Sequence, residues 1–385
     1  MTYNGLYMNK RQKSVYEKYS QIDYLKKNKL KTIEVDNGII LPAKKDTSPN
    51  PKLWAIGGVE SSDGKFIDES CSRSLFGGDY EYDEELIENI NEEVIFMGPF
   101  IKHWGHFLCD QINRLWYAAQ NKNKYKVAYC GWNWGTGNTD ITDNFLEVLE
   151  YIGIERDMLI NVQRPTRFKK VIIPEISFIP GDFYTKEFQL IIDTILKNVK
   201  LDDAVPKKVY FTREALGSNK EIGEEKISSY LSNMGYEIIS PEKLTFKEQI
   251  SIFNNSSEIA MMSGSIAHNI MFSQNNNTKI IILNKTDMIN DYQMAIDHIT
   301  KSPVTYIDIY KNVKKVLFGM GPFLIYVTKY LESFYNTNIN QKTTRKEIKL
   351  FRRKYKMIYS NINNKKLLKR QNKSIQFRKK EIKKI

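Results

Sequence analysis

The chain has 385 residues, and its 41% hydrophobic and 12% aromatic content excludes a mainly disordered protein. The formal net charge is +13, but residues 311–385 hold 22 Lys and Arg against 3 Glu, so the rest of the chain carries −6. The basic charge therefore belongs to the C-terminal tail, and the mildly acidic body argues against a folded surface that binds nucleic acid.

The N-terminus lacks the apolar stretch of a signal peptide, so we expect a cytoplasmic protein. Cys71, Cys109 and Cys130 lack the spacing of a zinc site, and we expect them to be reduced thiols. The length predicts two domains, with a link at 201–206.

In the first half, strands and helices alternate along the chain. The acidic stretch 79–93 is expected to form a loop and a helix, and a loop is expected at 131–138. Strands or short apolar runs are predicted at 38–41, 53–56, 93–97, 125–130 and 170–174, and helices at 103–117, 143–152 and 185–199. This alternation predicts an open α/β sheet.

The predicted helix at 103–117 has an apolar face and an unusual polar face. A solvated face normally carries Lys and Glu, whereas this one carries His103, His106, Asp110, Asn113, Arg114 and Tyr117. Two of the four histidines in the chain lie beside Asp110 on this face, which indicates a site. An ordinary ion pair between Asp110 and Arg114, with histidines that belong to the core, also fits the pattern.

After the link, strands at 209–212, 236–240, 258–262 and 279–283 alternate with helices at 223–234, 245–254 and from residue 265. This half is expected to be Rossmann-like. Ser263-Gly264-Ser265 joins a strand to a helix, where backbone N–H groups bind phosphate. A tight connection that needs glycine only for packing is the alternative.

Two cations follow the first strand of this half. Arg213 lies at the strand's end and Lys220 comes in the next loop, so both are candidates to neutralise a diphosphate. Neither a GxGxxG motif nor a Walker lysine pattern occurs, which disfavours dinucleotide and P-loop chemistry.

Three blocks of residues resemble glycosyltransferase family 61 and follow one another in that family's order. They are His106-Phe107-x-Cys109-Asp110-x-x-Asn113-Arg114, Phe246-x-Glu248-Gln249-x-x-x-Phe253 and Gly264-Ser265-x-x-His268-Asn269-x-x-Phe272, within about residues 90–285. The family includes plant xylosyltransferases, protein O-linked N-acetylglucosamine transferases and many bacterial capsule-locus proteins. The resemblance implies a GT-B fold, with two Rossmann-like domains facing a cleft, and an inverting, metal-independent transfer from a nucleotide sugar.

One block departs from the family. The usual Arg-x-x-Asn-Glu reads Lys220-Glu221-Ile222-Gly223-Glu224 here. Lysine keeps the charge but loses the bidentate geometry of arginine, and glycine removes the contact that the asparagine would make. Asp-x-Asp, the metal motif of the other large glycosyltransferase class, is absent, so we expect no metal or other cofactor.

The resemblance and the chemistry of inverting transfer together suggest roles for these residues. Asp110 is the first choice for the base that deprotonates the acceptor and His106 the second. Arg114 is expected to orient Asp110, with His103 and Asn113 nearby on the acceptor side. The donor is expected to be a UDP-sugar and to contact Arg213, Lys220, Glu248, Ser263, Gly264, Ser265, His268 and Asn269.

The tail is expected to be a separate basic segment. Its apolar run at 316–331 is too short to span a membrane and is interrupted by Gly319, Gly321 and Pro322. Apolar residues recur at helical spacing among its cations, which is typical of helices that bind anionic membrane surfaces; these are Ile348, Phe351, Tyr355 and Ile358. A solvated, partly disordered tail is the alternative.

These observations predict three parts: an acceptor-side domain at 1–200, a nucleotide-sugar-binding domain at 207–310 and a basic tail at 311–385. The expected function is sugar transfer to a free or lipid-linked glycan in bacterial capsular or surface polysaccharide synthesis at the inner face of the cell membrane. A polysaccharide pyruvyltransferase and a nucleic-acid-binding protein that uses the tail are the alternatives.

Overall fold

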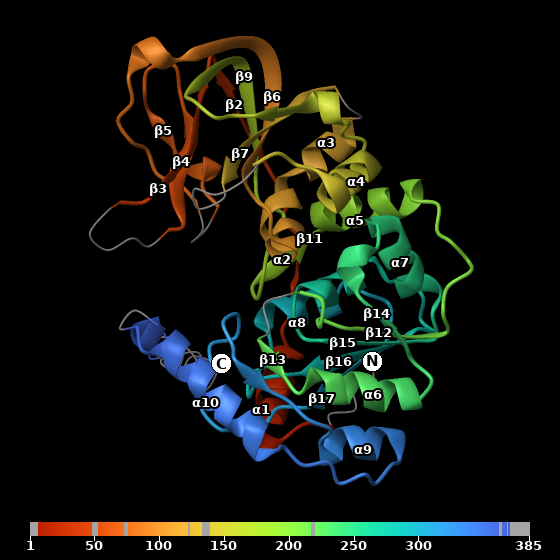
Figure 1. Cartoon of the computed structure of the whole chain (residues 1–385). Helices are drawn as coiled ribbons and strands as arrows, with labels where there is room; N and C mark the ends of the chain where they lie inside the picture. The colour runs from red at the N-terminus through yellow and green to blue at the C-terminus, as the bar shows by residue number, and fades with distance from the viewer. Residues whose placement is uncertain are drawn as a thin grey trace. The chain divides into compact units, whose positions relative to one another are not determined.

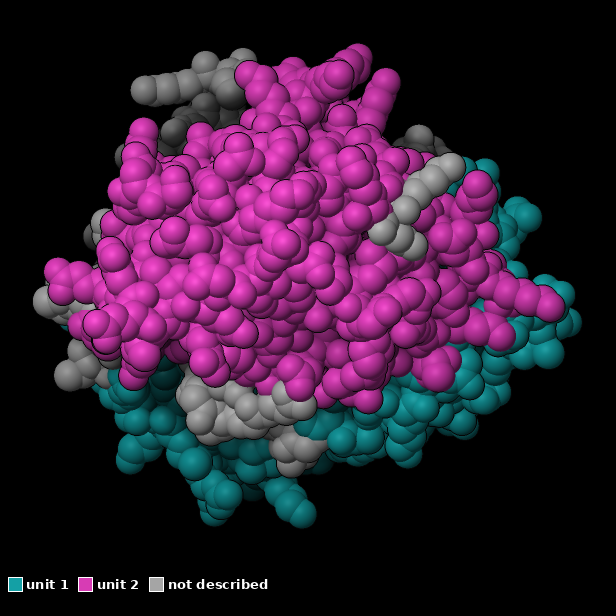
Figure 2. All heavy atoms as spheres, turned by 90° about the horizontal axis from the view of Figure 1, so that it is seen from above, with its two compact units in different colours: residues 1–22, 202–244, 248–385 teal, residues 23–201, 245–247 magenta. Residues whose placement is uncertain are grey.

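The computed structural model describes residues 7–47, 53–72, 76–121, 124–132, 139–216, 220–361, 364–367 and 369. The chain divides into unit 1, residues 1–22, 202–244 and 248–385, and unit 2, residues 23–201 and 245–247 (Figure 2). The boundary at residue 202 lies within the stretch expected to be a link. The boundary at residue 23 has no counterpart in the sequence-based division.

Unit 2 is built on a mixed sheet with the strand order β5-β4-β3-β9-β6-β7-β8, in which β2 pairs with β9 (Figure 1). Its strands are β2 (Thr32–Asp36), β3 (Ile39–Lys45), β4 (Ala55–Glu60), β5 (Phe66–Ile67), β6 (Glu88–Ile101), β7 (Lys126–Trp132), β8 (Leu159–Asn161) and β9 (Thr166–Pro174). The strands β9, β6, β7 and β8 run parallel, whereas β2 to β5 pair antiparallel. The α/β class is confirmed, but only the parallel part matches a Rossmann-like half.

The helices and smaller strands of unit 2 lie around this sheet. They are β1 (Leu25–Lys26), η2 (Asp68–Ser70), η3 (Glu84–Leu86), α4 (Asp143–Ile152), η6 (Arg156–Met158), β10 (Phe178–Ile179), β11 (Phe183–Thr185) and α5 (Lys186–Asn198). In the acidic stretch 79–93 the expected helix is reduced to η3, and β6 begins at Glu88. A loop was expected at 131–138. Residues 131 and 132 are the end of β7, and residues 133–138 lie outside the described residues.

The prediction of a single helix at 103–117 is wrong. The stretch divides into α2 (Trp104–His106), the π-helix η4 (Phe107–Gln111), the 3-10 helix η5 (Ile112–Arg114) and α3 (Trp116–Asn121). The Gln111 side chain bonds both backbone groups of Ile101, at 3.2 and 3.3 Å, and so ties the widened turn to the end of β6. Because a π-turn and a 3-10 turn change the rotation per residue, the two predicted faces do not persist.

Unit 1 contains a parallel sheet with the strand order β14-β12-β15-β16-β17. In chain order this is 2-1-3-4-5, a doubly wound arrangement, as expected for a Rossmann-like half. Its elements are β12 (Lys208–Phe211), β13 (Glu221–Ile222), α6 (Glu224–Asn233), β14 (Glu237–Ile239), η7 (Pro241–Lys243), α7 (Phe246–Asn255), β15 (Glu258–Met262), η8 (Ser265–Phe272), β16 (Lys279–Asn284), α8 (Asp291–Asp297) and β17 (Val304–Asp308). The helix expected from residue 265 is the 3-10 helix η8.

The C-terminal elements complete the core of unit 1. They are β18 (Phe323–Leu324), which pairs with β13, α9 (Lys329–Tyr335) and α10 (Arg345–Tyr359). Phe351 and Tyr359 of α10 are buried, and Ile348, Tyr355 and Ile358 pack against the same cluster. Residues 311–361 are thus part of unit 1, in contrast to their expected role as a separate tail. The residues from 370 onward lie outside the described residues.

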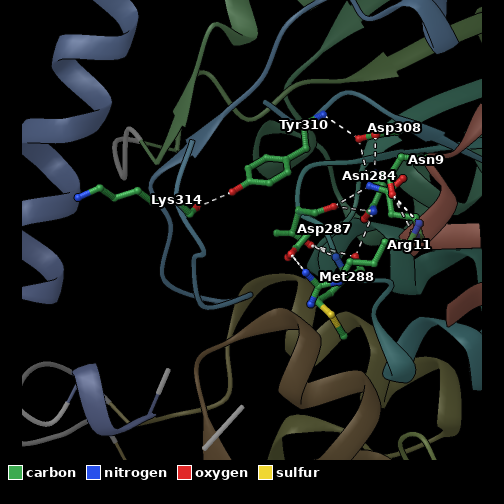
Figure 3. A network of polar contacts seen from close by, with 10 residues as sticks. Asn9, Arg11, Asn284, Asp287, Met288, Asp308, Tyr310 and Lys314 are labelled. Atoms are coloured by element: carbon green, nitrogen blue, oxygen red, sulfur yellow. Dashed lines mark hydrogen bonds and ion pairs between the residues drawn. The ribbon is translucent and has the colours of Figure 1, made fainter. Parts of the chain in front are cut away.

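The N-terminal helix α1 (Lys10–Tyr19) also belongs to unit 1. Its N-cap Asn9 donates from Nδ2 to Asp308 Oδ2 at 2.8 Å, and Arg11 pairs with Asp287 at 2.7 Å (Figure 3). Buried Gln12 donates to Asp308 Oδ1 at 3.0 Å and to the carbonyl of Thr286 at 2.7 Å. The first helix of the chain therefore docks at the carboxyl ends of β16 and β17.

Candidate active site

In unit 2, His106 and Asp110 form a close pair. Nδ1 of His106 lies 2.7 Å from Oδ2 of Asp110, and their side chains are 21% and 13% exposed. His106 ends α2 and Asp110 lies in the following π-helix, an irregular element that is frequent at functional sites. If Nδ1–H donates to the carboxylate, the other ring nitrogen of His106 keeps its lone pair and can accept a proton.

Aromatic neighbours restrict the His106 ring. The Trp54 ring meets it edge-on at a centroid distance of 4.8 Å, and the His103 ring lies 4.7 Å away. His103 is the N-cap residue of α2, and its Nδ1 accepts from the backbone N–H of His106 at 3.4 Å. His103 therefore shapes the start of the helix beside the pair.

Asn113 and Arg114 do not have the roles expected for them. Arg114 is 1% exposed, and its guanidinium donates to the carbonyls of Pro174, Glu69 and Cys71. Burial lowers the pKa of Arg114 to about 10. Buried Asn113 donates to the carbonyl of Phe178 at 3.3 Å. The expectation that Arg114 orients Asp110 is corrected, because its donors tie separate loops of unit 2 together.

In unit 1, three neighbouring parallel strands bring a second group of residues to one edge of the sheet. Arg213 follows β12, Ser263 and Gly264 follow β15, and Lys285 follows β16. A Cβ atom on Gly264 would lie 3.3 Å from Nη1 of Arg213 and 3.9 Å from Nζ of Lys285, so both cations adjoin this turn. Ligands of open α/β sheets bind at the carboxyl ends of strands.

One carboxylate holds both cations. Oε1 of Glu221 lies 3.0 Å from Nε of Arg213 and 2.6 Å from Nζ of Lys285. The side chains of Glu221, Lys285 and Arg213 are 3%, 5% and 17% exposed. Two cations thus share the Glu221 carboxylate next to the Gly264 turn, and the carboxylate of Glu224 lies close by, 2.6 Å from the backbone nitrogen of Arg213. Ser263 Oγ is buried there and has no hydrogen-bond partner among the described residues.

Burial sets the protonation of this cluster. Burial, followed by the charge of Arg213, lowers the pKa of Lys285 to about 8. Although burial acts in the opposite direction, Lys285 and Arg213 lower the pKa of Glu221. The carboxylate is thus charged at neutral pH, and Lys285 loses its proton more readily than an ordinary lysine.

The block that departs from the family has a local explanation. Glu224 accepts from the Arg213 N–H at 2.6 Å and from the hydroxyls of Thr212 and Tyr210, so it fixes the end of β12. Gly223 has φ +97° and a Cβ there would collide with the carbonyl of Ile325, so an asparagine would not fit. Lys220 donates from Nζ to the carbonyl of Gly319 at 3.0 Å.

His268 and Asn269 are buried in unit 1. Nδ1 of His268 lies 2.9 Å from Gln293 Oε1, and Asn269 donates to Gln249 Oε1 at 2.7 Å. These bonds hold η8 against α8 and α7, and the expectation that both residues contact sugar or nucleoside hydroxyls stays a prediction. Glu248 is exposed in the first turn of α7, and Ser265 begins η8.

Sequence reasoning missed Lys285, the clamping role of Glu221, and Trp54. Lys285 could have been predicted from the sequence. Arg213 was selected as a cation that follows a parallel strand, and Lys285 follows β16 in the same way. Glu221 lies in the block that departs from the family, but no local pattern predicts its contact with Lys285, which is 64 residues away in the sequence. Trp54 precedes β4 and gives no local signal.

No group of three or more His, Cys, Asp or Glu side chains among the described residues is arranged to hold a metal ion. Within the same described ranges, none of the helices combines the length and the hydropathy needed to cross a membrane.

Residues 104–281 match the model of the family described as Glycosyltransferase 61. The matched segment includes the His106–Asp110 pair, Arg213 and the Gly264 turn, and it ends before Lys285. No curated protein matches the chain.

Proposed function

Because residues 104–281 match the model of glycosyltransferase family 61, we propose that the chain is a member of this family and transfers a sugar, with inversion, from a UDP-sugar to a hydroxyl of a glycan. The family implies a nucleotide-sugar donor and a glycan acceptor in general. The observation that supports the donor part best is the pair of cations, Arg213 and Lys285, that Glu221 clamps beside the Gly264 turn.

The donor's diphosphate is the leaving group, and its developing charge needs stabilisation. Arg213 offers a planar fork of donors that suits phosphate oxygens, and Lys285 offers a point charge. The unpartnered hydroxyl of Ser263 and the small residues of the turn leave room for a phosphate oxygen nearby. Groups held in advance by a buried carboxylate need little reorganisation as the bond between sugar and phosphate breaks.

The acceptor hydroxyl needs a base. We assign this role to His106 Nε2, with Asp110 as the residue that holds the ring and stabilises its charged form. The bond between acceptor oxygen and anomeric carbon forms as the bond to the diphosphate breaks, and the acceptor proton goes to His106. From the sequence alone, Asp110 comes before His106 as the candidate base. We reverse this order because the Asp110 carboxylate is already in contact with Nδ1 of His106, at 2.7 Å.

The proposal needs no metal, since two side-chain cations neutralise the diphosphate. The 2-1-3-4-5 sheet of unit 1 and the division into two units support the GT-B expectation, which stays a proposal. Synthesis of a bacterial capsular or surface polysaccharide at the inner face of the membrane also stays a proposal. It is supported by the exposed cations of α10, which suit an anionic surface.

A thermal-shift experiment on the full chain tests the donor site. UDP, GDP, CMP and their sugars are added to the wild-type protein, to Arg213→Ala and to the control Arg352→Ala, which removes an exposed arginine of α10. A ligand at 100 times its Kd stabilises by about 2.7 kcal/mol. We expect UDP compounds to raise the Tm of the wild type and the control, with the shift lost in Arg213→Ala and unchanged by EDTA.

Stabilisation by phosphoenolpyruvate instead of any nucleotide would favour the pyruvyltransferase alternative. Stabilisation by none of them, with or without Mn²⁺, would refute the donor site. A strongly salt-dependent affinity for RNA or DNA would favour the nucleic-acid alternative.

Kinetics with the donor that the screen identifies test the base. His106→Gln and Asp110→Asn are expected to lower kcat by about 10²- to 10⁴-fold while the nucleotide still raises Tm. Asp110→Glu, which keeps the carboxylate, is expected to recover part of the rate. A His106→Gln variant with wild-type kcat would exclude this assignment.

A further inference from the structure

A hollow of about 420 Å³ lies in unit 2, apart from the residues assigned above. Its walls come from the end of β3, the stretch 80–86, the end of β7 and the segment 162–165, and they include Pro42, Lys44, Tyr80, Tyr82, Gln163 and Arg164. Small-molecule sites begin at about 300 Å³, so the hollow has room for a small ligand.

Two tyrosine rings in this wall are held in place by their hydroxyls. Tyr80 donates to the carbonyl of Pro42 at 2.8 Å, and Tyr82 donates to Oε2 of Glu60 at 2.7 Å. Nζ of Lys44 lies 4.7 Å from the centre of the Tyr80 ring. Rings that are already fixed lose little conformational entropy when a ligand packs against them.

The charges and polar groups of the wall indicate the class of ligand. The wall carries two cations, Lys44 and Arg164, and two carboxylates, Glu81 and Asp83, and Arg164 also pairs with Glu88 at 3.6 Å. A polyanion would meet the carboxylates unfavourably, whereas a neutral ligand would not. Fixed aromatic rings beside amide, carboxylate and guanidinium groups suit a molecule with an apolar C–H face and a rim of hydroxyls. A neutral sugar unit has this form.

The hollow adjoins the strand ends from which the His106–Asp110 segment starts. Gly131, in its wall, pairs with Phe100 of β6, and residues 103–110 follow β6 directly. On the other side, Lys44 pairs with Ile56 at the start of β4, and Trp54, just before β4, contacts His106. Two separate pairs of strands thus link the hollow to the proposed base within one unit.

We propose that this hollow binds a neutral sugar unit of the acceptor glycan, an inference that rests on the proposed function. The residues from Pro42 to Leu86 that build much of its wall lie outside the segment 104–281 shared with the family. Elements outside the shared segment are where a chain selects its own acceptor, since the transfer chemistry belongs to the family.

Binding of defined glycans to the full chain tests the proposal. The probes are neutral trisaccharides of glucose, galactose, mannose, xylose and N-acetylglucosamine, with trigalacturonic acid as the charged comparator. Affinity is measured by calorimetry and by saturation-transfer NMR. We expect at least one neutral trisaccharide to bind at millimolar or lower concentration, and the acidic one to bind more weakly.

Variants locate the site. Tyr82→Ala and Arg164→Ala are expected to weaken this binding about fivefold or more, the effect of about 1 kcal/mol from a lost ring or hydrogen bond. Tyr82→Phe keeps the ring and most of the affinity. Arg156→Ala, which removes another exposed arginine of unit 2 outside the hollow, leaves the affinity unchanged. UDP stabilisation, read separately, is the same in all four variants.

The proposal is overturned if no neutral trisaccharide binds, if the acidic one binds more tightly, or if Arg164→Ala binds like the wild type. Glycan binding that depends on Arg164 in a chain that UDP does not stabilise would keep the glycan site and refute the proposed donor. The two failures are therefore distinguishable.

Discussion

Lys285 and Arg213 are brought together by a residue of opposite charge rather than by adjacency in the chain. Glu221 contacts both within 3.0 Å, and removing it would leave the buried Lys285 and the partly buried Arg213 in mutual repulsion. The Glu221 carboxylate thus holds the two cations together beside the Gly264 turn, where we propose that the diphosphate binds. Lys285 is the member of this group whose charge is sensitive to pH near neutrality.

The affinity for UDP is predicted to fall as the pH rises through about 8, because the pKa of Lys285 is lowered to about 8 and its ammonium form binds phosphate. Between pH 7 and 9 the Kd is expected to rise about tenfold, because the protonated fraction of a group with a pKa of about 8 falls about tenfold over this range. Lys285→Arg, which stays charged, is expected to remove this dependence. Calorimetric titration with UDP at both pH values checks it, and equal pH profiles for the two proteins would contradict it.

At the scale of elements, α10 shows how an amphipathic helix can be recognised while its partner is not. Its apolar residues do recur at helical spacing, and Thr344 and Glu347 form a capping box at its start. The apolar face is occupied, however, since Phe351 is fully buried in the core of unit 1. Attraction of this helix to a membrane would therefore come from its exposed cations and would weaken with salt.

Phe351→Ala is predicted to lower the free energy of unfolding by about 3–5 kcal/mol, the usual loss for a buried phenylalanine. The matched control on the same helix is Met357→Ala, because Met357 is 71% exposed and its truncation should cost little. Urea unfolding followed by circular dichroism measures both. Equal stabilities of the two variants would mean that α10 does not belong to the core.

At the scale of the whole molecule, the chain begins in one unit and enters the other before returning to the first. Residues 7–22 form part of unit 1 together with residues from 202 onward, 180 or more positions later. The docking depends on buried polar contacts from Asn9 and Gln12 to Asp308 (Figure 3). Burial raises the pKa of Asp308, so the donors from α1 offset part of the cost of its charge.

Gln12→Ala is predicted to destabilise the protein by about 1–3 kcal/mol, because it removes two hydrogen bonds and leaves Asp308 and the Thr286 carbonyl with fewer donors. Lys13→Ala is the control, since Lys13 is exposed and its ion pair with Glu17 is 3.8 Å long. Chemical unfolding of both variants measures the difference. A Gln12→Ala protein as stable as the control would show that α1 contributes little to unit 1.

The candidate site was only partly accessible from sequence. Arg213 and the Gly264 turn were found because a cation or a small-residue turn directly after a buried strand is a local pattern. The family-like blocks also contain His268, Asn269, Asn113 and Arg114, and the structure buries all four side chains. Motif membership does not distinguish a side chain that holds the fold from one that faces a ligand, because both are constrained.

What the sequence determined by itself is the alternation of strands and helices, the α/β class and the position of three family blocks, since periodicity, turns and short motifs act over a few residues. The tertiary structure decided the rest. It set the π-turn at 107–111, the burial of Arg114, the packing of α10 into the core of unit 1 and the ion pair of Lys285 with Glu221. Each of these depends on groups distant in the chain that compete for the same donors, charges and apolar surface, and that competition is resolved only when the whole chain packs.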